Sequence, residues 1–182
     1  MTLTGSQERY GAIMQAIHWL TAILVLAAFI VGEGGPESRV YAPERDAQRM
    51  LHESLGLAVL ALVAIRIVWR LRDRAPDAPP MPRWMARAAA AGHGLLYLLL
   101  IAVPLTAILG AWWEGHPVEA YLIGAIAPPF SQAHDLGAWI TELHTWLGDA
   151  IIWLAGFHAA AALGHHFLLR DRVLLSMLPG RK

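Results

Sequence analysis

The stretch HTWLGDAIIWLAGFH, from His144 to His158, places two histidines fourteen residues apart in an apolar segment. At about 100° per residue, fourteen residues make four turns less about 40°, so in a helix both imidazoles share one face, about 21 Å apart along the axis. A metal or haem held by histidine pairs needs a second imidazole at each level. The stretch therefore predicts a helix that presents two stacked histidines to partners on neighbouring helices.

Composition narrows the class of protein. Of the 182 residues, 57% are hydrophobic and only 15% are charged, which is typical of a membrane protein. The formal net charge is zero, so no electrostatic argument points to nucleic acid as a partner. The chain has no cysteine, which excludes disulfides, iron–sulfur clusters and thiolate zinc sites. Metal chemistry must therefore depend on the nine histidines, on carboxylates or on a bound cofactor.

Four apolar stretches are each long enough to cross a hydrocarbon layer of about 30 Å, which takes about 20 helical residues. They run over residues 11–31, 51–69, 88–112 and 138–169. The apolar piece at 118–127 is too short to span and is expected at the membrane surface. The first stretch does not resemble a cleaved signal peptide and is expected to be retained. The sequence predicts an all-α integral membrane protein, with residues 1–182 forming a single membrane domain, a four-transmembrane-helix bundle in contact with lipid.

Basic residues lie mainly on one side of the predicted bundle. The second connection with its flanks and the C-terminal tail carry ten of them, whereas the third connection carries none: Arg66, Arg70, Arg72, Arg74, Arg83, Arg87, Arg170, Arg172, Arg181 and Lys182. Cytoplasmic loops of membrane proteins are enriched in Lys and Arg. We therefore expect both termini to be cytoplasmic, and the first and third loops to face the outer side.

This topology allows the histidines to be matched by depth. His18 lies early in a helix that starts in the cytoplasm, and His158 lies late in a helix that returns there, so both fall in the inner half. His52 and His144 begin helices that start on the outer side. An axial pair on one haem iron needs two imidazoles at equal depth on facing helices. The depths predict His18 and His158 as ligands of an inner haem iron, and His52 and His144 as ligands of an outer one.

A single histidine in or near a membrane helix need not be a ligand. An isolated intramembrane histidine can simply hydrogen-bond a neighbouring helix. His116 and His134, in the third loop, are interpreted as ordinary interfacial residues. Small residues near the four paired histidines, among them Gly56, Gly148 and Ala155, would leave flat space for a porphyrin, although close helix packing uses the same residues.

Two arginines are candidates for binding haem propionates. Arg66 stands fourteen residues after His52, on the same helix face and at the depth of the inner pair, where its guanidinium could pair with inner-haem propionates. The alternative is that Arg66 extends its side chain to the membrane interface and keeps its charge in water, as arginines near the end of a membrane span usually do. Arg49, one turn before His52, could bind propionates of the outer haem. The alternative is that Arg49 is a solvated loop residue.

Three further histidines lie near the inner side without an evident axial partner. His165 follows His158 by seven residues, His166 is next to it, and His93 opens the third helix at a similar depth. Histidine titrates near neutral pH, so His93 and His165 could exchange protons with a quinone and hydrogen-bond it. Ordinary interfacial histidines are the alternative.

Several motifs together resemble the bacterial cytochrome b561 family of small dihaem membrane cytochromes. They are AIHWL (16–20), LHESLG (51–56), AIRIVWRL (64–71), GHGLLYLLLIAVPLT (92–106) and FHAAAALGHHF (157–167). The resemblance covers essentially the whole chain and implies a four-helix bundle with two haem b groups in the bacterial inner membrane. It also implies His18, His52, His144 and His158 as axial ligands, the set that depth matching selects.

The resemblance implies two kinds of activity. One branch of the family is a superoxide oxidase, in which superoxide on the outer side gives electrons to the haems, ubiquinone accepts them and dioxygen is released. Other branches are haem subunits that carry electrons from a dehydrogenase or hydrogenase to quinone. A short chain without an added redox domain favours the first activity, in which this protein is a superoxide:quinone oxidoreductase. A non-enzymatic haem-binding scaffold is a third possibility.

Physical arguments agree in part with superoxide as the donor. Iron held by two histidines has no open position, so outer-sphere electron transfer is its natural chemistry. Arginines of the first loop would attract a small anion, and neighbouring carboxylates would weaken that attraction. The residues concerned are Arg39, Arg45 and Arg49 on one hand, and Glu33, Glu37, Glu44 and Asp46 on the other.

Overall fold

The computed structural model describes residues 4–6, 8–32, 34–73 and 75–179; Glu33, Arg74, Arg181 and Lys182, used above for charge arguments, lie outside these ranges. Within them, four helices are long and apolar enough to cross a membrane. These are α1 (Ala12–Val31), α3 (Asp46–Arg72), α4 (Arg83–Glu114) and α5 (His134–Gly164). The predicted membrane helical bundle is thereby confirmed.

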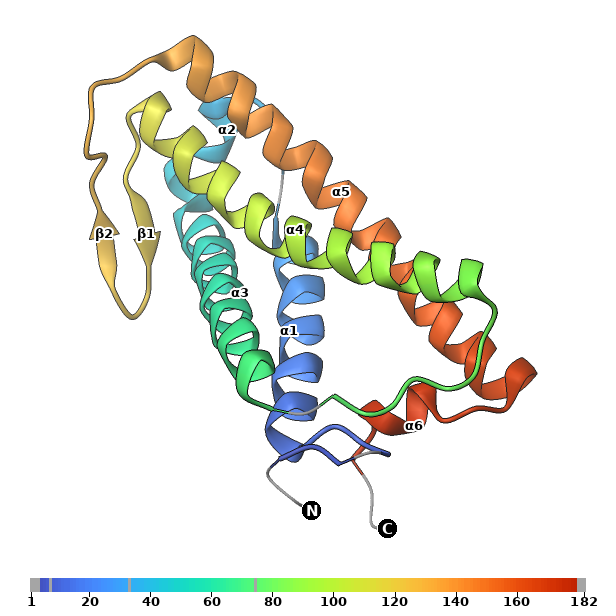
Figure 1. The fold of residues 1–182 in the computed structure, drawn as a ribbon. Coiled ribbons are helices and arrows are strands. Elements are labelled where there is room, and N and C mark those ends of the chain that lie inside the picture. The colour runs from blue at the N-terminus through green and yellow to red at the C-terminus, as the bar shows by residue number, and fades with distance from the viewer. Residues whose placement is uncertain (1–3, 7, 33, 74, 180–182) are drawn as a thin grey trace.

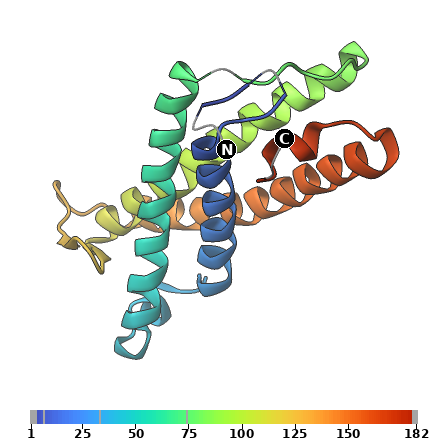
Figure 2. The ribbon, with the colours of Figure 1, turned by 90° about the horizontal axis from the view of Figure 1, so that it is seen from below.

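The four long helices form two pairs. α1 packs mainly against α3, and α4 packs mainly against α5. The two pairs cross each other, as the view in Figure 2 shows. The start of α1 and the short helix α6 (Val173–Met177) lie at one end of the bundle (Figure 1), which we call the terminal end. The opposite end, which holds α2 (Glu37–Val40) and the start of α5, is the hairpin end.

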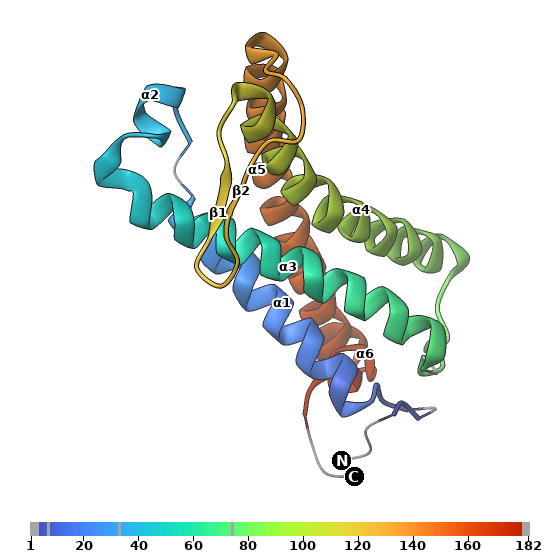
Figure 3. The same cartoon turned by 90° about the vertical axis from the view of Figure 1, so that its left-hand side faces the viewer.

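Short elements cover the hairpin end. Helix α2 and the 3₁₀ turn η1 (Pro43–Arg45) connect α1 to α3. Strands β1 (Val118–Ala120) and β2 (Gly124–Ile126) form an antiparallel hairpin between α4 and α5. The hairpin lies against α3 (Figure 3), where the Tyr121 amide donates a 3.0 Å hydrogen bond to Ser54 Oγ. The short apolar piece of the third connection is therefore a hairpin.

The terminal end is closed by the last part of the chain. After Gly164 the helix widens into the π-helical turn η2 (His165–Leu169), which ends at Arg170 in the left-handed conformation (φ 55°). Helix α6 then lies against the start of α1. There Gln15 and Trp19 donate side-chain hydrogen bonds, of 3.1 and 2.8 Å, to the carbonyls of Ser176 and Met177. The 138–169 stretch of the sequence is therefore α-helical only to Gly164.

A small apolar core joins α3, α4 and α5 near their middle. It consists of Val59, Val63, Leu99, Leu100 and Ile151, and Val63 is only 1% exposed. Lipid is as apolar as these side chains, so close packing rather than the hydrophobic effect holds such helices together. Large apolar side chains also cover the outside of the long helices, including Ile23, Leu98, Trp153 and Phe157. The bundle thus presents to its surroundings the surface that lipid requires.

Candidate functional site

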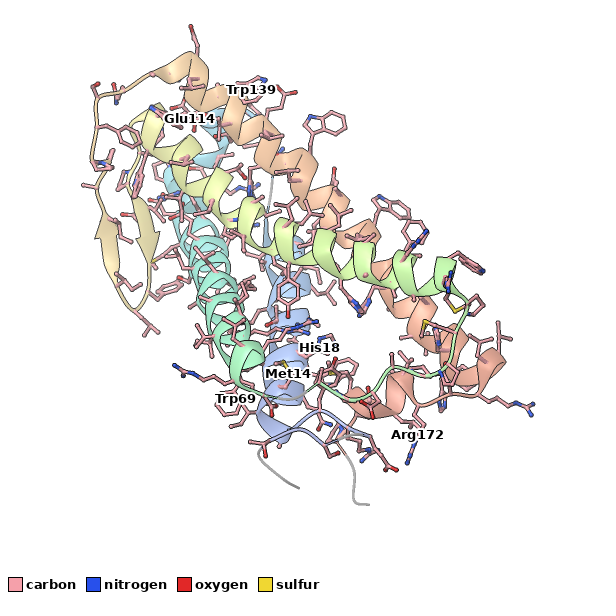
Figure 4. The ribbon with its side chains drawn as sticks, viewed as in Figure 1. Met14, His18, Trp69, Glu114, Trp139 and Arg172 are labelled. Atoms are coloured by element: carbon pink, nitrogen blue, oxygen red, sulfur yellow. The ribbon has the colours of Figure 1, made fainter. Side chains whose placement is uncertain are left out.

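Two pairs of histidines lie between helices at two levels of the bundle. The ring centres of His18 on α1 and His158 on α5 are 6.3 Å apart, and the ring planes meet at 73°. The ring centres of His52 on α3 and His144 on α5 are 6.0 Å apart, at 82°. Figure 4 shows His18 on the part of α1 near the terminal end. The structure therefore brings together the residues that were paired by depth.

The spacing of each pair fits one metal ion. An imidazole nitrogen binds a metal ion at about 2 Å and lies about 1 Å from its own ring centre, so two imidazoles on opposite sides of one ion have centres about 6 Å apart. Both observed separations match this value. Two trans imidazoles are also the axial donor set that haem iron takes in b-type cytochromes. The ring-centre separation of each pair is therefore the one that two imidazole ligands of a single metal ion would have.

Backbone carbonyls orient the hairpin-end pair. Nδ1 of His52 lies 2.9 Å from the Ala28 carbonyl oxygen, and Nδ1 of His144 lies 2.9 Å from the Val103 carbonyl oxygen. A carbonyl can only accept, so in each ring Nδ1 carries the hydrogen and Nε2 keeps its lone pair. Each histidine thus has the tautomer that coordinates a metal through Nε2.

The terminal-end pair has different surroundings. Nδ1 of His18 is buried and has no hydrogen-bond partner among the described residues. A third imidazole, that of His93 on α4, has its ring centre 5.4 Å from that of His158. No sequence pattern predicts that His93 joins this pair, because depth along a helix says nothing about which helices face each other. The terminal-end site therefore has an additional titratable neighbour.

A cavity of about 470 Å³ adjoins the hairpin-end pair, within the range of about 300–1,000 Å³ typical of ligand sites. His52 and His144 line it, together with Gly56 and Gly148. A Cβ atom at either glycine would meet nothing within 4 Å. The small residues thus leave open space beside the paired rings, as a flat porphyrin would need.

Arg49 borders the same cavity but is not a solvated loop residue. Its guanidinium lies 2.9 Å from Asp46, 3.3 Å from Glu53 and 2.9 Å from Glu119. Glu53 also accepts a hydrogen bond from the Glu119 amide, so this network ties strand β1 to α3. Of the three guanidinium nitrogens of Arg49, Nε alone is buried without a hydrogen-bond partner among the described residues. Its charge is therefore offset by carboxylates.

Arg66 is half-buried near the terminal-end pair, close enough to act electrostatically on both His18 and His158. Its guanidinium carbon lies 5.4 Å from the ring centre of Tyr97, and that of Arg70 lies 5.7 Å from the same ring. Nε of Arg66 and the Tyr97 hydroxyl are buried without partners in the described part of the chain. Arg66 thus offers an unused N–H donor near the two imidazoles.

His165 is engaged within the turn that follows α5. Its Nδ1 lies 2.5 Å from Oδ2 of Asp171, and the other oxygen of Asp171 accepts the Val173 amide. Burial alone would raise the pKa of the Asp171 carboxyl, but the hydrogen bonds from His165 and Val173 outweigh it and lower that pKa. His165 and Asp171 thus form a hydrogen-bonded acid–base pair at the terminal end.

A polar cluster at the hairpin end is not predicted by any sequence motif. Nε2 of His116 lies 2.6 Å from one oxygen of Glu37, and Nε2 of His134 lies 2.7 Å from the other. The hydrogen bond from His116 has the largest effect on the pKa of Glu37, and that from His134 the next largest. Together they hold this pKa below its usual range. Tyr41 stacks on His116 at 3.5 Å, and burial raises the pKa of its phenol. Both loop histidines therefore fasten α2 over the cavity.

The chain is similar to proteins named as cytochromes and to one named as a probable superoxide oxidase. Residues 9–180 match the family described as prokaryotic cytochrome b561. Cytochrome b561 homolog 2 of Escherichia coli (strain K12) is 34% identical over 183 residues, covering 98% of this chain and 95% of that protein. The probable superoxide oxidase CybB of Yersinia pestis is 35% identical over 179 residues, covering 96% and 98%. Cytochrome b562 of Cereibacter sphaeroides is 33% identical over 178 residues, covering 94% and 96%.

These matches span nearly the whole chain and confirm the resemblance seen in its motifs. They agree with the long apolar helices and with the paired histidines at two levels of α5. The chain belongs to the prokaryotic cytochrome b561 family of membrane proteins, which bind b-type haem and transfer electrons.

Proposed function

We propose that the chain holds two haem b groups, one between His18 and His158 and one between His52 and His144, and that it oxidises superoxide and reduces ubiquinone. The name of the Yersinia pestis relative, a probable superoxide oxidase, supports the choice of donor. The observation that carries the proposal is the spacing of the two pairs, 6.3 and 6.0 Å between ring centres, at two levels of one helix.

The reaction balances as a two-electron process. Two superoxide anions each lose one electron and become dioxygen, while one ubiquinone takes up the two electrons and two protons and becomes ubiquinol. Haem iron, when bound, accepts and gives up one electron at a time. Because each iron would have both axial positions filled by histidine, the donor need not bind to it. The protein's part is to hold the sites, keep them apart and supply protons to the quinone.

Charge supports an orientation for this reaction. The terminal end carries Arg66, Arg70, Arg72, Arg83, Arg87, Arg170 and Arg172. By the positive-inside rule we place this end in the cytoplasm and the hairpin end outside a bacterial inner membrane. Superoxide then approaches the cavity at the hairpin end, where Arg39 and Arg45 are among the lining residues. Quinone is reduced at the terminal end.

Further residues take supporting roles in this proposal. Arg66, with its unused Nε, binds propionates of the inner haem. The carboxylate partners of Arg49 leave its Nε without a hydrogen-bond partner. This Nε donates a hydrogen bond to the outer haem. His93, beside His158, hydrogen-bonds the quinone, and His165 with Asp171 passes protons to it.

The test is stopped-flow mixing of the oxidised, haem-loaded protein with a superoxide pulse, followed by measurement of ubiquinol. We expect haem reduction faster than uncatalysed superoxide dismutation, and we expect added superoxide dismutase to abolish it. The His144→Ala variant, which lacks a ligand of the outer haem, should lose the fast phase. If the wild type is not reduced faster than dismutation, superoxide is not the donor. A dehydrogenase or hydrogenase partner would then have to supply the electrons.

A further inference from the structure

The two histidine pairs differ in the hydrogen bonds behind their rings. Both imidazoles of the hairpin-end pair donate from Nδ1 to a backbone carbonyl, that of Ala28 for His52 and that of Val103 for His144. At the terminal end, Nδ1 of His18 is buried and finds no acceptor among the described residues. The rings of the two sites are therefore polarised differently by the protein.

This difference acts on the reduction potential. A hydrogen bond from Nδ1–H to a carbonyl makes the opposite nitrogen, Nε2, a stronger electron donor to a bound metal. Stronger donation stabilises the oxidised metal relative to the reduced one and lowers the potential of the site. Two such bonds lower the potential at the hairpin end, and His18 lacks the corresponding bond at the terminal end.

Charges near the two sites act in the same direction. At the terminal end, Arg66 is half-buried beside the histidine pair, and no described carboxylate forms an ion pair with it. A positive charge there stabilises an added electron, and it still offsets negative charge if the guanidinium binds a propionate. At the hairpin end, Arg49 is surrounded by three carboxylates, those of Asp46, Glu53 and Glu119. Its charge therefore does not favour reduction of the nearby site.

We propose that these contacts give the terminal-end site the higher reduction potential, and that Arg66 is the residue that sets this order. One electron then leaves the hairpin-end site, which is oxidised, and enters the terminal-end site, which is reduced, without an input of energy. The inference rests on the two-haem ligation proposed above, but it does not depend on superoxide being the donor. It assigns the direction of electron flow across the bundle.

The experiment is a redox titration of the haem-loaded protein followed by visible absorbance. His144→Ala leaves the terminal-end site, and His158→Ala leaves the hairpin-end site, so each variant identifies one component of the wild-type curve. We expect the component that remains in His144→Ala to have the higher midpoint potential. Arg66→Gln should lower that component and leave the other in place, whereas Arg66→Lys, which keeps the charge, should leave both near their wild-type values.

A matched control is Arg87→Gln, which removes an exposed charge from α4 at the same end and should shift neither component. The proposal is overturned if the component in His144→Ala is the lower one, or if Arg66→Gln shifts the hairpin-end component instead. If Arg66→Gln binds less haem, the order of the two midpoint potentials, measured with His144→Ala and His158→Ala, still tests which site has the higher potential. A protein with the expected order that superoxide fails to reduce would contradict the proposed donor and leave this inference standing.

Discussion

Gly32 lies directly against the imidazole of His52, so that a Cβ atom at residue 32 would stand 2.6 Å from Cε1 and 2.7 Å from Nδ1 of that ring. The carbonyl of Ala28 accepts both the Gly32 amide, at 2.8 Å, and Nδ1 of His52, at 2.9 Å. The end of α1 and the ring of His52 thus share one acceptor. The missing side chain at residue 32 is what lets the ring reach it.

Replacing Gly32 by alanine should therefore push the His52 ring away from the Ala28 carbonyl. Without that hydrogen bond, we expect the hairpin-end haem to have a raised midpoint potential and to dissociate faster, while the terminal-end haem is unchanged. Redox titration and haem transfer to a globin acceptor measure both effects. Gly156→Ala is the control, because a Cβ atom there meets nothing within 4 Å on an exposed face. A G32A curve identical to that of the wild type would contradict this role for Gly32.

The ligand assignment predicts a simple result for haem content. His144→Ala and His158→Ala should each retain half the haem of the wild-type protein, because each removes one of two axial ligands from one site only. Pyridine haemochrome analysis of the purified variants measures haem per chain. His134→Ala, which removes a histidine from outside both pairs, should keep the full content. Full content in both ligand variants would refute the pairing.

Filling the cavity should remove the outer haem without disturbing the fold. Gly148 lines the cavity and has open space where a side chain would begin, so Gly148→Leu would occupy the room beside His144. We expect half the wild-type haem content and an unchanged helical circular dichroism spectrum. Gly156→Leu, at an exposed position that does not line the cavity, should keep both haems. Wild-type haem content in Gly148→Leu would show that the haem does not occupy this space.

The hairpin-end cluster makes stability depend on pH through Glu37. Because its pKa is lowered from an ordinary value of 4.5, the carboxylate stabilises the fold above that pH and loses this effect as the pH falls through the lowered value. Near neutral pH, Glu37→Gln should therefore reduce stability by about 1 kcal/mol or less. Its thermal unfolding curve should converge with that of the wild type in acid. A difference that stays constant down to strongly acidic pH would argue against this origin.

Much of the fold follows from patterns that a linear sequence carries. Apolar stretches of more than about 20 residues suffice to identify membrane helices, and the constant rise of a helix converts position into depth. That is why His18 could be matched with His158 and His52 with His144 before any helix was placed in space. The family motifs independently lead to the same four residues.

Other contacts depend on lateral arrangement, which depth does not encode. His93 lies beside His158 because α4 packs along α5. No residue spacing in the sequence predicts that these two helices are neighbours. Glu37 meets His116 and His134 across 79 and 97 residues of chain. Arg49 likewise meets Glu119 only once the hairpin folds back on α3. Such polar contacts at helix ends are individually weak and leave no periodic signal.

The small apolar core between the two levels of histidines has an electrical consequence. Val59 and Val63 lie between His52 and Arg66 on α3, and Ile151 lies between His144 and His158 on α5. Tightly packed hydrocarbon lets an electron tunnel, but a proton needs a chain of hydrogen-bonding groups to cross. In the proposed two-haem arrangement, this layer would let electrons pass between the two sites and would block the passage of protons. Each electron that crosses it moves one negative charge without a compensating proton, so turnover itself would charge the membrane.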